Sequence, residues 1–147
     1  MGALSARIIA KVSGPAWKPL CGQFLQMARL LLAASPDADS QLVSAYVKFT
    51  TNSDPQTRVF AAIWLKSSKR LIVGLALPEE YEAEELGPAL PGTMYKGLTK
   101  YFVVERGSAV PKGFAEWAGL AYQNAMSAVP SKGFQFAARE RALRRAG

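Results

Sequence analysis

Residues 58–77, RVFAAIWLKSSKRLIVGLAL, decide the fold of this chain. Two apolar runs, Arg58 to Lys66 and Lys69 to Leu77, are separated by Ser67-Ser68, and this arrangement predicts a β-hairpin. Because Ser-Ser is not a strong two-residue turn, a wider loop from Lys66 to Lys69 is an equal alternative, and it leaves the register unchanged. The predicted cross-strand pairs are Trp64 with Leu71, Ala62 with Val73 and Phe60 with Leu75.

Both faces of this hairpin are apolar. On the predicted pairing the larger side chains face the helices of the domain, namely Phe60, Trp64, Leu71, Val73, Leu75 and Leu77. The opposite face carries smaller apolar residues, namely Val59, Ala61, Ile63, Leu65, Ile72, Gly74 and Ala76. A solvated sheet face would alternate polar residues, so we expect a cover: the N-terminal segment, the C-terminal tail, a second subunit or a ligand. The candidate interface residues for a partner or a homodimer are Val59, Ala61, Ile63, Leu65 and Ile72.

The flanking segments predict two helices and two further strands. Ser13-Gly14-Pro15 predicts a helix start with Ser13 as a possible N-cap, and the helical stripe of apolar residues that follows ends at Pro36. Alternating residues predict strands at Tyr46–Thr50 and at Leu98–Glu105, and Val110-Pro111 precedes a second helix. We therefore expect an α+β fold in which an antiparallel sheet of about four strands packs against two helices, followed by a basic C-terminal tail.

The expected organisation is one α+β domain at residues 13–130, with an N-terminal lead at 1–12 and a basic tail at 131–147. A length of 147 residues, half of them apolar and 20% charged, is typical of one globular domain. The longest uncharged apolar run is too short to span a bilayer, and basic residues interrupt the apolar start. With Cys21 as the one cysteine, these features favour a cytoplasmic location and no membrane partner.

The net charge of +7 is concentrated in the tail. Residues 131–147 hold a single acid and five basic residues, which are Lys132, Arg139, Arg141, Arg144 and Arg145. Arginine is a good phosphate ligand, so this tail is a candidate nucleic-acid-binding segment. A second set of cations lies at the hairpin tip and beside the last strand, with tyrosines available for stacking: Lys66, Lys69, Arg70, Lys96 and Lys100, with Tyr46, Tyr95 and Tyr101. For this second set we favour an ordinary solvated surface.

Histidine is absent from the chain, which excludes Ser-His-Asp and Cys-His catalysis and any histidine metal site. The spacing of Cys, Asp and Glu predicts no metal site, and the sequence predicts no cofactor. The acidic run Glu79 to Glu85 is interpreted as a solvated loop, and Cys21 as a structural thiol on a helical apolar stripe.

Four segments, taken in order, resemble a small bacterial family of domains of unknown function, some of whose members are labelled as transport proteins. The segments are SAYVKFTTN, VFAAIWLKSSKRLIVGLALPEE, LTKYFVVERGSAVP and FAEWAGLAYQNA, within residues 20–128. The shared features are structural: a strand, a hairpin, a strand and a closing helix with Ala121-Tyr122. The resemblance implies a compact α+β unit without an established reaction. Many members carry a histidine near the strand that is KYFVV here, and this chain has none.

These observations support three hypotheses of function. The first is a small, non-catalytic binding or accessory module that self-associates or binds a partner through an apolar sheet face. The alternative is a nucleic-acid-associated protein that contacts phosphates through its basic tail without reading sequence. The third, an enzyme using Lys, Tyr or Glu, requires a pocket in which Lys48 or Lys100 meets Tyr46 or Tyr95.

Overall fold

The computed structural model describes residues 4–15, 17–43, 45–51, 58–67 and 69–127. This part of the chain contains, in order, α1 (Ala6–Val12), α2 (Lys18–Leu32), β1 (Asp39–Val43), β2 (Tyr46–Thr50), β3 (Val59–Ser67), β4 (Arg70–Leu75), β5 (Lys100–Glu105) and α3 (Phe114–Ser127). The predicted α+β class is confirmed. The sheet has five strands where about four were expected, and the described helices number three where two were expected. The basic tail lies outside the described residues.

The segment Ser13-Gly14-Pro15 separates two helices instead of starting one. Ser13 is the C-cap of α1, and its N–H donates to the Ile9 carbonyl at 3.0 Å. The prediction of a helix start at Ser13 is therefore wrong, because α2 begins at Lys18 with a proline in its first turn. Proline is tolerated there since the first N–H groups of a helix have no intrahelical partner. The lead is thus partly an ordered helix that buries Ile8 and Val12.

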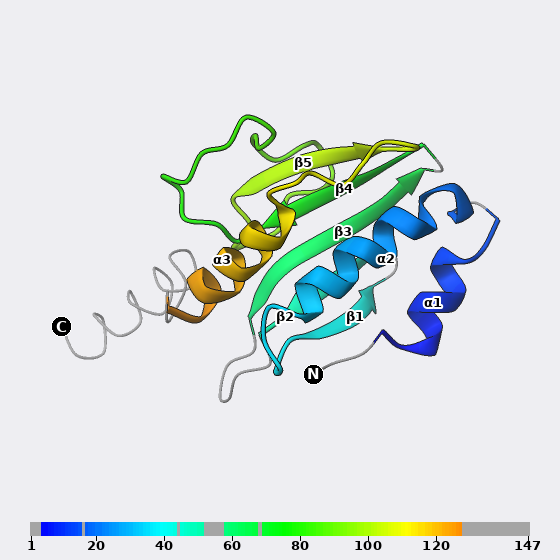
Figure 1. The fold of residues 1–147 in the computed structure, drawn as a ribbon, viewed down its shortest axis with the longest axis horizontal. Coiled ribbons are helices and arrows are strands. Elements are labelled where there is room, and N and C mark those ends of the chain that lie inside the picture. Colours follow the sequence, from blue (N-terminus) through cyan, green and yellow to red (C-terminus); the bar gives the residue numbers. More distant parts are fainter. Residues whose placement is uncertain (1–3, 16, 44, 52–57, 68, 128–147) are drawn as a thin grey trace.

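The sheet is an antiparallel meander in which every strand pairs with the next one in the sequence, in the order β1-β2-β3-β4-β5. Figure 1 shows α2 and α3 lying across one face of this sheet. The ring of Phe102 in β5 contacts Phe114 and Trp117 of α3, with centroid separations of 5.8 and 5.5 Å. The main core therefore lies between this sheet face and the two helices.

The strands β3 and β4 do not pair in the predicted register. The observed pairs are Ala61 with Leu75, Ala62 with Gly74, Ile63 with Val73 and Trp64 with Ile72. The hairpin closes at Ser67–Arg70, and an irregularity between Trp64 and Ser67 adds one residue to β3. A one-residue shift turns side chains to the opposite face, so Trp64 points away from the helices and Ile63 toward them. The predicted pairs Trp64–Leu71, Ala62–Val73 and Phe60–Leu75 are wrong.

A second bulge lies in β3 at Phe60. Thr50 pairs with Val59 and Phe49 pairs with Ala61, which leaves Phe60 as the extra residue. Its ring is fully buried and makes an edge contact with Tyr122 of α3 at 5.1 Å. The prediction that Phe60 faces the helices is confirmed, although a bulge and not simple alternation places it there.

The sheet face away from the helices is covered by the connection between β4 and β5, residues 76–99. Tyr95 of this connection makes an edge contact with Tyr46 of β2 at 5.8 Å, and its N–H donates to the Tyr101 hydroxyl at 3.1 Å. A Cβ on Gly74 would lie 2.7 Å from the Tyr101 ring and 3.1 Å from the Leu98 side chain, so glycine permits this close approach. We expected the N-terminal segment or the tail as a cover within the chain, whereas the described structure assigns this part to residues 76–99.

Candidate functional site

The five residues predicted as an interface lie on two faces of the sheet. Ile63 pairs with Val73, which pairs with the helix-contacting Phe102, so Ile63 and its alternate neighbours Ala61 and Leu65 point toward the helices. Ile72 pairs with Trp64 on the opposite face. Val59 is partly buried, and the other four are buried within the chain. Their assignment to one face of the sheet is wrong because the β3 bulge exchanges the two faces of that strand.

Exposed cations gather at the end of the sheet where the β3–β4 turn lies. The Arg106 N–H donates to the Lys69 carbonyl at 2.8 Å, which holds these two residues together. Arg70 forms an ion pair with Glu105 at 3.7 Å, with both side chains about half exposed, so the pair contributes little stability.

The helix α2 brings a further cation to the same end. The Gln23 amide donates to the Glu105 and Ser108 carbonyls at 2.8 and 2.6 Å, and this contact ties the first half of α2 to the end of β5. Lys18, the first residue of α2, is exposed. We call Lys18, Lys69, Arg70 and Arg106 the basic end of the molecule.

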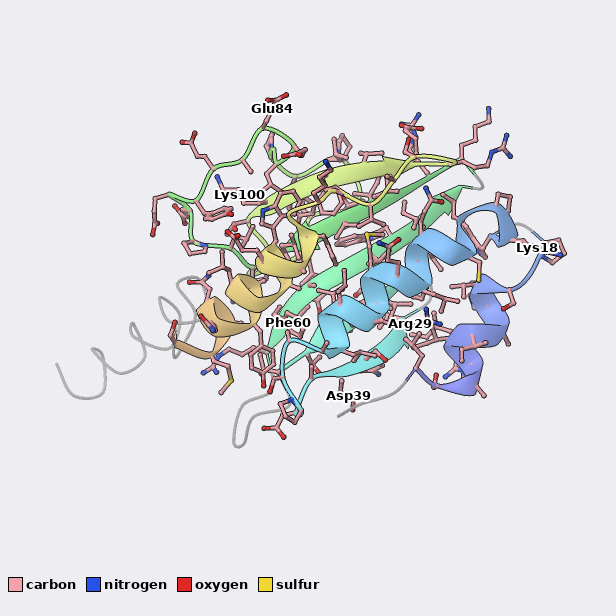
Figure 2. The ribbon with its side chains drawn as sticks, viewed as in Figure 1. Lys18, Arg29, Asp39, Phe60, Glu84 and Lys100 are labelled. Carbon is pink, nitrogen blue, oxygen red and sulfur yellow. The ribbon has the colours of Figure 1, made fainter. Side chains whose placement is uncertain are left out.

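An acidic segment lies at the opposite end of the molecule. Its members are five exposed glutamates in the β4–β5 connection, namely Glu79, Glu80, Glu82, Glu84 and Glu85. In Figure 2, Glu84 and Lys18 lie at opposite ends of the molecule. The exposure of all five carboxylates agrees with the interpretation of this run as a solvated loop.

A half-open cleft of about 370 Å³ lies between the acidic segment and the start of β5. Its lining residues are Tyr81, Glu82, Ala83, Leu86, Gly87, Pro88, Thr99 and Lys100. The Tyr81 hydroxyl donates to Glu116 Oε2 at 3.0 Å, and this hydrogen bond raises the pKa of Tyr81. The Thr99 hydroxyl donates to the Leu77 carbonyl at 2.6 Å. Both hydroxyls are thus engaged in hydrogen bonds within the protein. Lys100 lines this cleft together with Tyr81, whereas Tyr46 and Tyr95 are not among its lining residues.

Tyr46 and Lys48 share the loop-covered face of the sheet. Tyr46 stacks on Trp64 at 5.2 Å and meets the edge of Tyr95. Burial raises the pKa of Tyr46, the neighbouring Tyr95 raises it further, and the positive charge of Lys48 offsets part of the increase. A phenol with a raised pKa stays protonated at neutral pH, so Tyr46 keeps its proton there.

The predicted tail residues Lys132, Arg139, Arg141, Arg144 and Arg145 lie outside the described residues. The hairpin cations Lys69 and Arg70 were identified from the sequence only as a local cluster. Their association with Lys18 and Arg106, which are far away in the sequence, was missed. The available signal was the absence of any acidic residue before Asp37, which makes the first helices purely basic.

Comparison of the chain with protein-family models, with curated proteins and with solved structures gave no match. The resemblance to a family of domains of unknown function therefore stays a prediction. Among the helices of the described chain, none has the length and apolar character needed to cross a membrane.

Proposed function

We propose that the protein is a small binding module that associates with nucleic acid by contacting phosphates, without reading base sequence. The observation that carries this proposal is the basic end, where four exposed cations accompany a single carboxylate, Glu105. Clustered lysine and arginine side chains on one surface are the electrostatic signature of phosphate recognition.

The distribution of charge supports an oriented encounter with a polyanion. The basic end and the acidic segment lie at opposite ends of the molecule (Figure 2), so the field of the protein turns one end toward phosphates and the other end away. The basic residues of 131–147 add positive charge to the chain and are part of the proposal as a second, separable contact.

Binding through an apolar sheet face receives less support. In the described chain, helices cover one face and residues 76–99 cover the other, and Trp64 is only 4% exposed. A partner would have to displace one of these covers to reach the sheet.

The proposal is tested by fluorescence anisotropy with labelled single- and double-stranded oligonucleotides at several salt concentrations. We compare the wild type with Lys18→Glu/Arg106→Glu at the basic end and with Lys96→Glu/Lys100→Glu near the opposite end, a control with the same change in charge. We expect wild-type affinity to fall steeply with salt. The basic-end variant should bind about tenfold or more weakly at low salt, with a salt slope reduced by about two.

The control variant should stay within about threefold of the wild type, because charges outside the contact act only through the screened field. Equal losses in the two variants would show that net charge and not the basic end determines binding. Binding that is absent in the wild type, or that ignores salt, would overturn the proposal. The affinity of a chain that ends at Pro130 gives the part of the binding free energy that the tail contributes.

A further inference from the structure

The side chain of Met94, in the connection between β4 and β5, stands out among the described residues by its exposure. It is 78% exposed, whereas Ile9, the other exposed large apolar side chain of the described chain, is 45% exposed. The other described methionines lie deeper in the protein. Met27 of α2 is fully buried, and Met126 of α3 is partly buried against the core. Among the described methionines, Met94 therefore presents its thioether most openly to solvent.

Hydrogen bonds on both sides of Met94 hold its side chain outside the core. Thr93 is fully buried, and its N–H and hydroxyl both donate to the Leu90 carbonyl, at 3.0 and 2.8 Å. On the other side, the Tyr95 N–H donates to the Tyr101 hydroxyl at 3.1 Å. Because both of its neighbours are anchored, Met94 cannot turn inward without breaking one of these contacts.

We propose that Met94 is the methionine at which the folded protein reacts with hydroperoxides. With hydrogen peroxide, the thioether sulfur donates an electron pair to one peroxide oxygen, and the O–O bond breaks as the S–O bond forms. The proton of the transferred oxygen passes to the leaving hydroxide, so the products are methionine sulfoxide and water. The sulfur loses two electrons and the peroxide gains two. Since the peroxide must touch the sulfur, exposure selects Met94 over Met27 and Met126.

The folded state should tolerate a sulfoxide at this position. Oxidation converts an apolar side chain into a polar one, which disrupts packing where the methionine is buried. At Met94 the new oxygen meets water, and the hydrogen bonds that anchor Thr93 and Tyr95 use groups that the reaction leaves unchanged. The sulfoxide also stays accessible to methionine sulfoxide reductases, whose thiols remove the oxygen as water and become a disulfide. The modification is therefore reversible in the folded protein.

The test measures the oxidation rate of each methionine in the full chain. A Cys21→Ser background removes the one thiol that competes for the oxidant. The folded protein is treated with hydrogen peroxide for increasing times and digested with trypsin, which places Met27, Met94 and Met126 in separate peptides for mass spectrometry. We expect Met94 to gain oxygen several-fold faster than Met126, and about a hundredfold faster than Met27, whose reaction requires the core to open.

Two controls separate exposure from intrinsic reactivity. In concentrated urea the three rates should become similar, because unfolding exposes every thioether. Met94→Leu should remove the fast oxidation of the folded protein, whereas the matched variant Met126→Leu should retain it. After selective oxidation at Met94, the thermal midpoint should stay that of the untreated protein. Reductases specific for the two sulfoxide epimers, supplied with a thiol reductant, should then restore the original mass.

Fast oxidation at Met94, an unchanged thermal midpoint and repair of the folded protein support the proposal. Equal rates at Met94 and Met126 in the folded protein overturn it, because exposure then does not select the site. A sulfoxide at Met94 that lowers the thermal midpoint, or that the reductases do not repair until the protein is unfolded, also overturns it.

Discussion

Both faces of the sheet are buried, but the segments that cover them differ in how their backbone polar groups are hydrogen-bonded. The helix-covered face is closed by α2 and α3, whose backbone groups are satisfied within each helix, so its stability comes mainly from packed rings such as Phe60 and Phe102. The loop-covered face is closed by residues 76–99, which have no helix or strand to satisfy their backbone groups.

Backbone hydrogen bonds of its turns and of the Gly87–Tyr101 bridge hold the connection, together with side-chain hydrogen bonds and one close approach. Thr93 donates to the Leu90 carbonyl at 2.8 Å, and Tyr101 accepts from the Tyr95 N–H. Gly74 leaves the space into which the Tyr101 ring fits. The comparison indicates that damage to the helix-covered face should lower global stability, whereas damage to the loop-covered face should first release the connection.

The largest effect is expected from Phe102→Ala on the helix-covered face. This change removes a buried ring that contacts Phe114 and Trp117, and it leaves a cavity that helix and sheet cannot close. We expect the free energy of unfolding to fall by about 3–5 kcal/mol, measured by urea denaturation. Val103→Ala, at the neighbouring half-buried position on the opposite face, is the control. An equal loss in both variants would show that the side chains of the two faces contribute equally to the free energy of unfolding.

An intermediate effect is expected from Gly74→Ala on the loop-covered face. The new Cβ would lie 2.7 Å from the Tyr101 ring, so the ring and the connection must move, at a cost of about 1–3 kcal/mol. Hydrogen exchange should increase within residues 76–99 while α3 stays protected. Gly22→Ala is the control, because nothing lies within 4 Å of its Cβ and alanine favours the helix α2. Equal exchange in the connection of both variants would contradict the prediction.

The smallest effect is expected from Tyr101→Phe, which removes only the hydroxyl that accepts the Tyr95 N–H. We expect a loss of about 1 kcal/mol at neutral pH, because a partly buried donor is left without its acceptor.

The same variant should change how stability depends on pH. Burial raises the pKa of Tyr101 above its ordinary value of 10.0, so the folded state retains this proton to higher pH than the unfolded state. The resulting stability is complete below the unfolded pKa and is lost as the pH rises through the folded pKa. Urea midpoints measured from neutral to alkaline pH should therefore decline less steeply in Tyr101→Phe. Parallel declines would rule out this contribution.

The sequence predicted the elements that carry a strong periodic pattern. The strand Tyr46–Thr50 matches its prediction, and the hairpin and the helical stripe are present with adjusted ends. The edge strand β1, with the sequence DSQLV, was missed because it shows no clear alternation of apolar and polar residues. The two β3 bulges were missed because they depend on how the strand meets its neighbours, and this error assigned Ala61, Ile63 and Leu65 to the wrong face.

The candidate site was only partly accessible from the sequence. Lys69 and Arg70 are adjacent in the chain and form a visible cluster, whereas Lys18 and Arg106 join them through the Gln23 contact between α2 and β5. No local pattern encodes that contact. The covering role of residues 76–99 was hidden for a similar reason, since apolar residues such as Leu90 and Leu98 are scattered among turns.

The long connection between β4 and β5 has a consequence for the order of folding. Strands β1 to β4 pair with neighbours that are close in the sequence, so these pairings require only short loops to close. We expect the strand β5 and the helix α3 to join later, because residues 76–99 separate β4 from β5 and must close first. Because this same segment forms the cover, we expect the last strand and the second face to become ordered together, as one cooperative step.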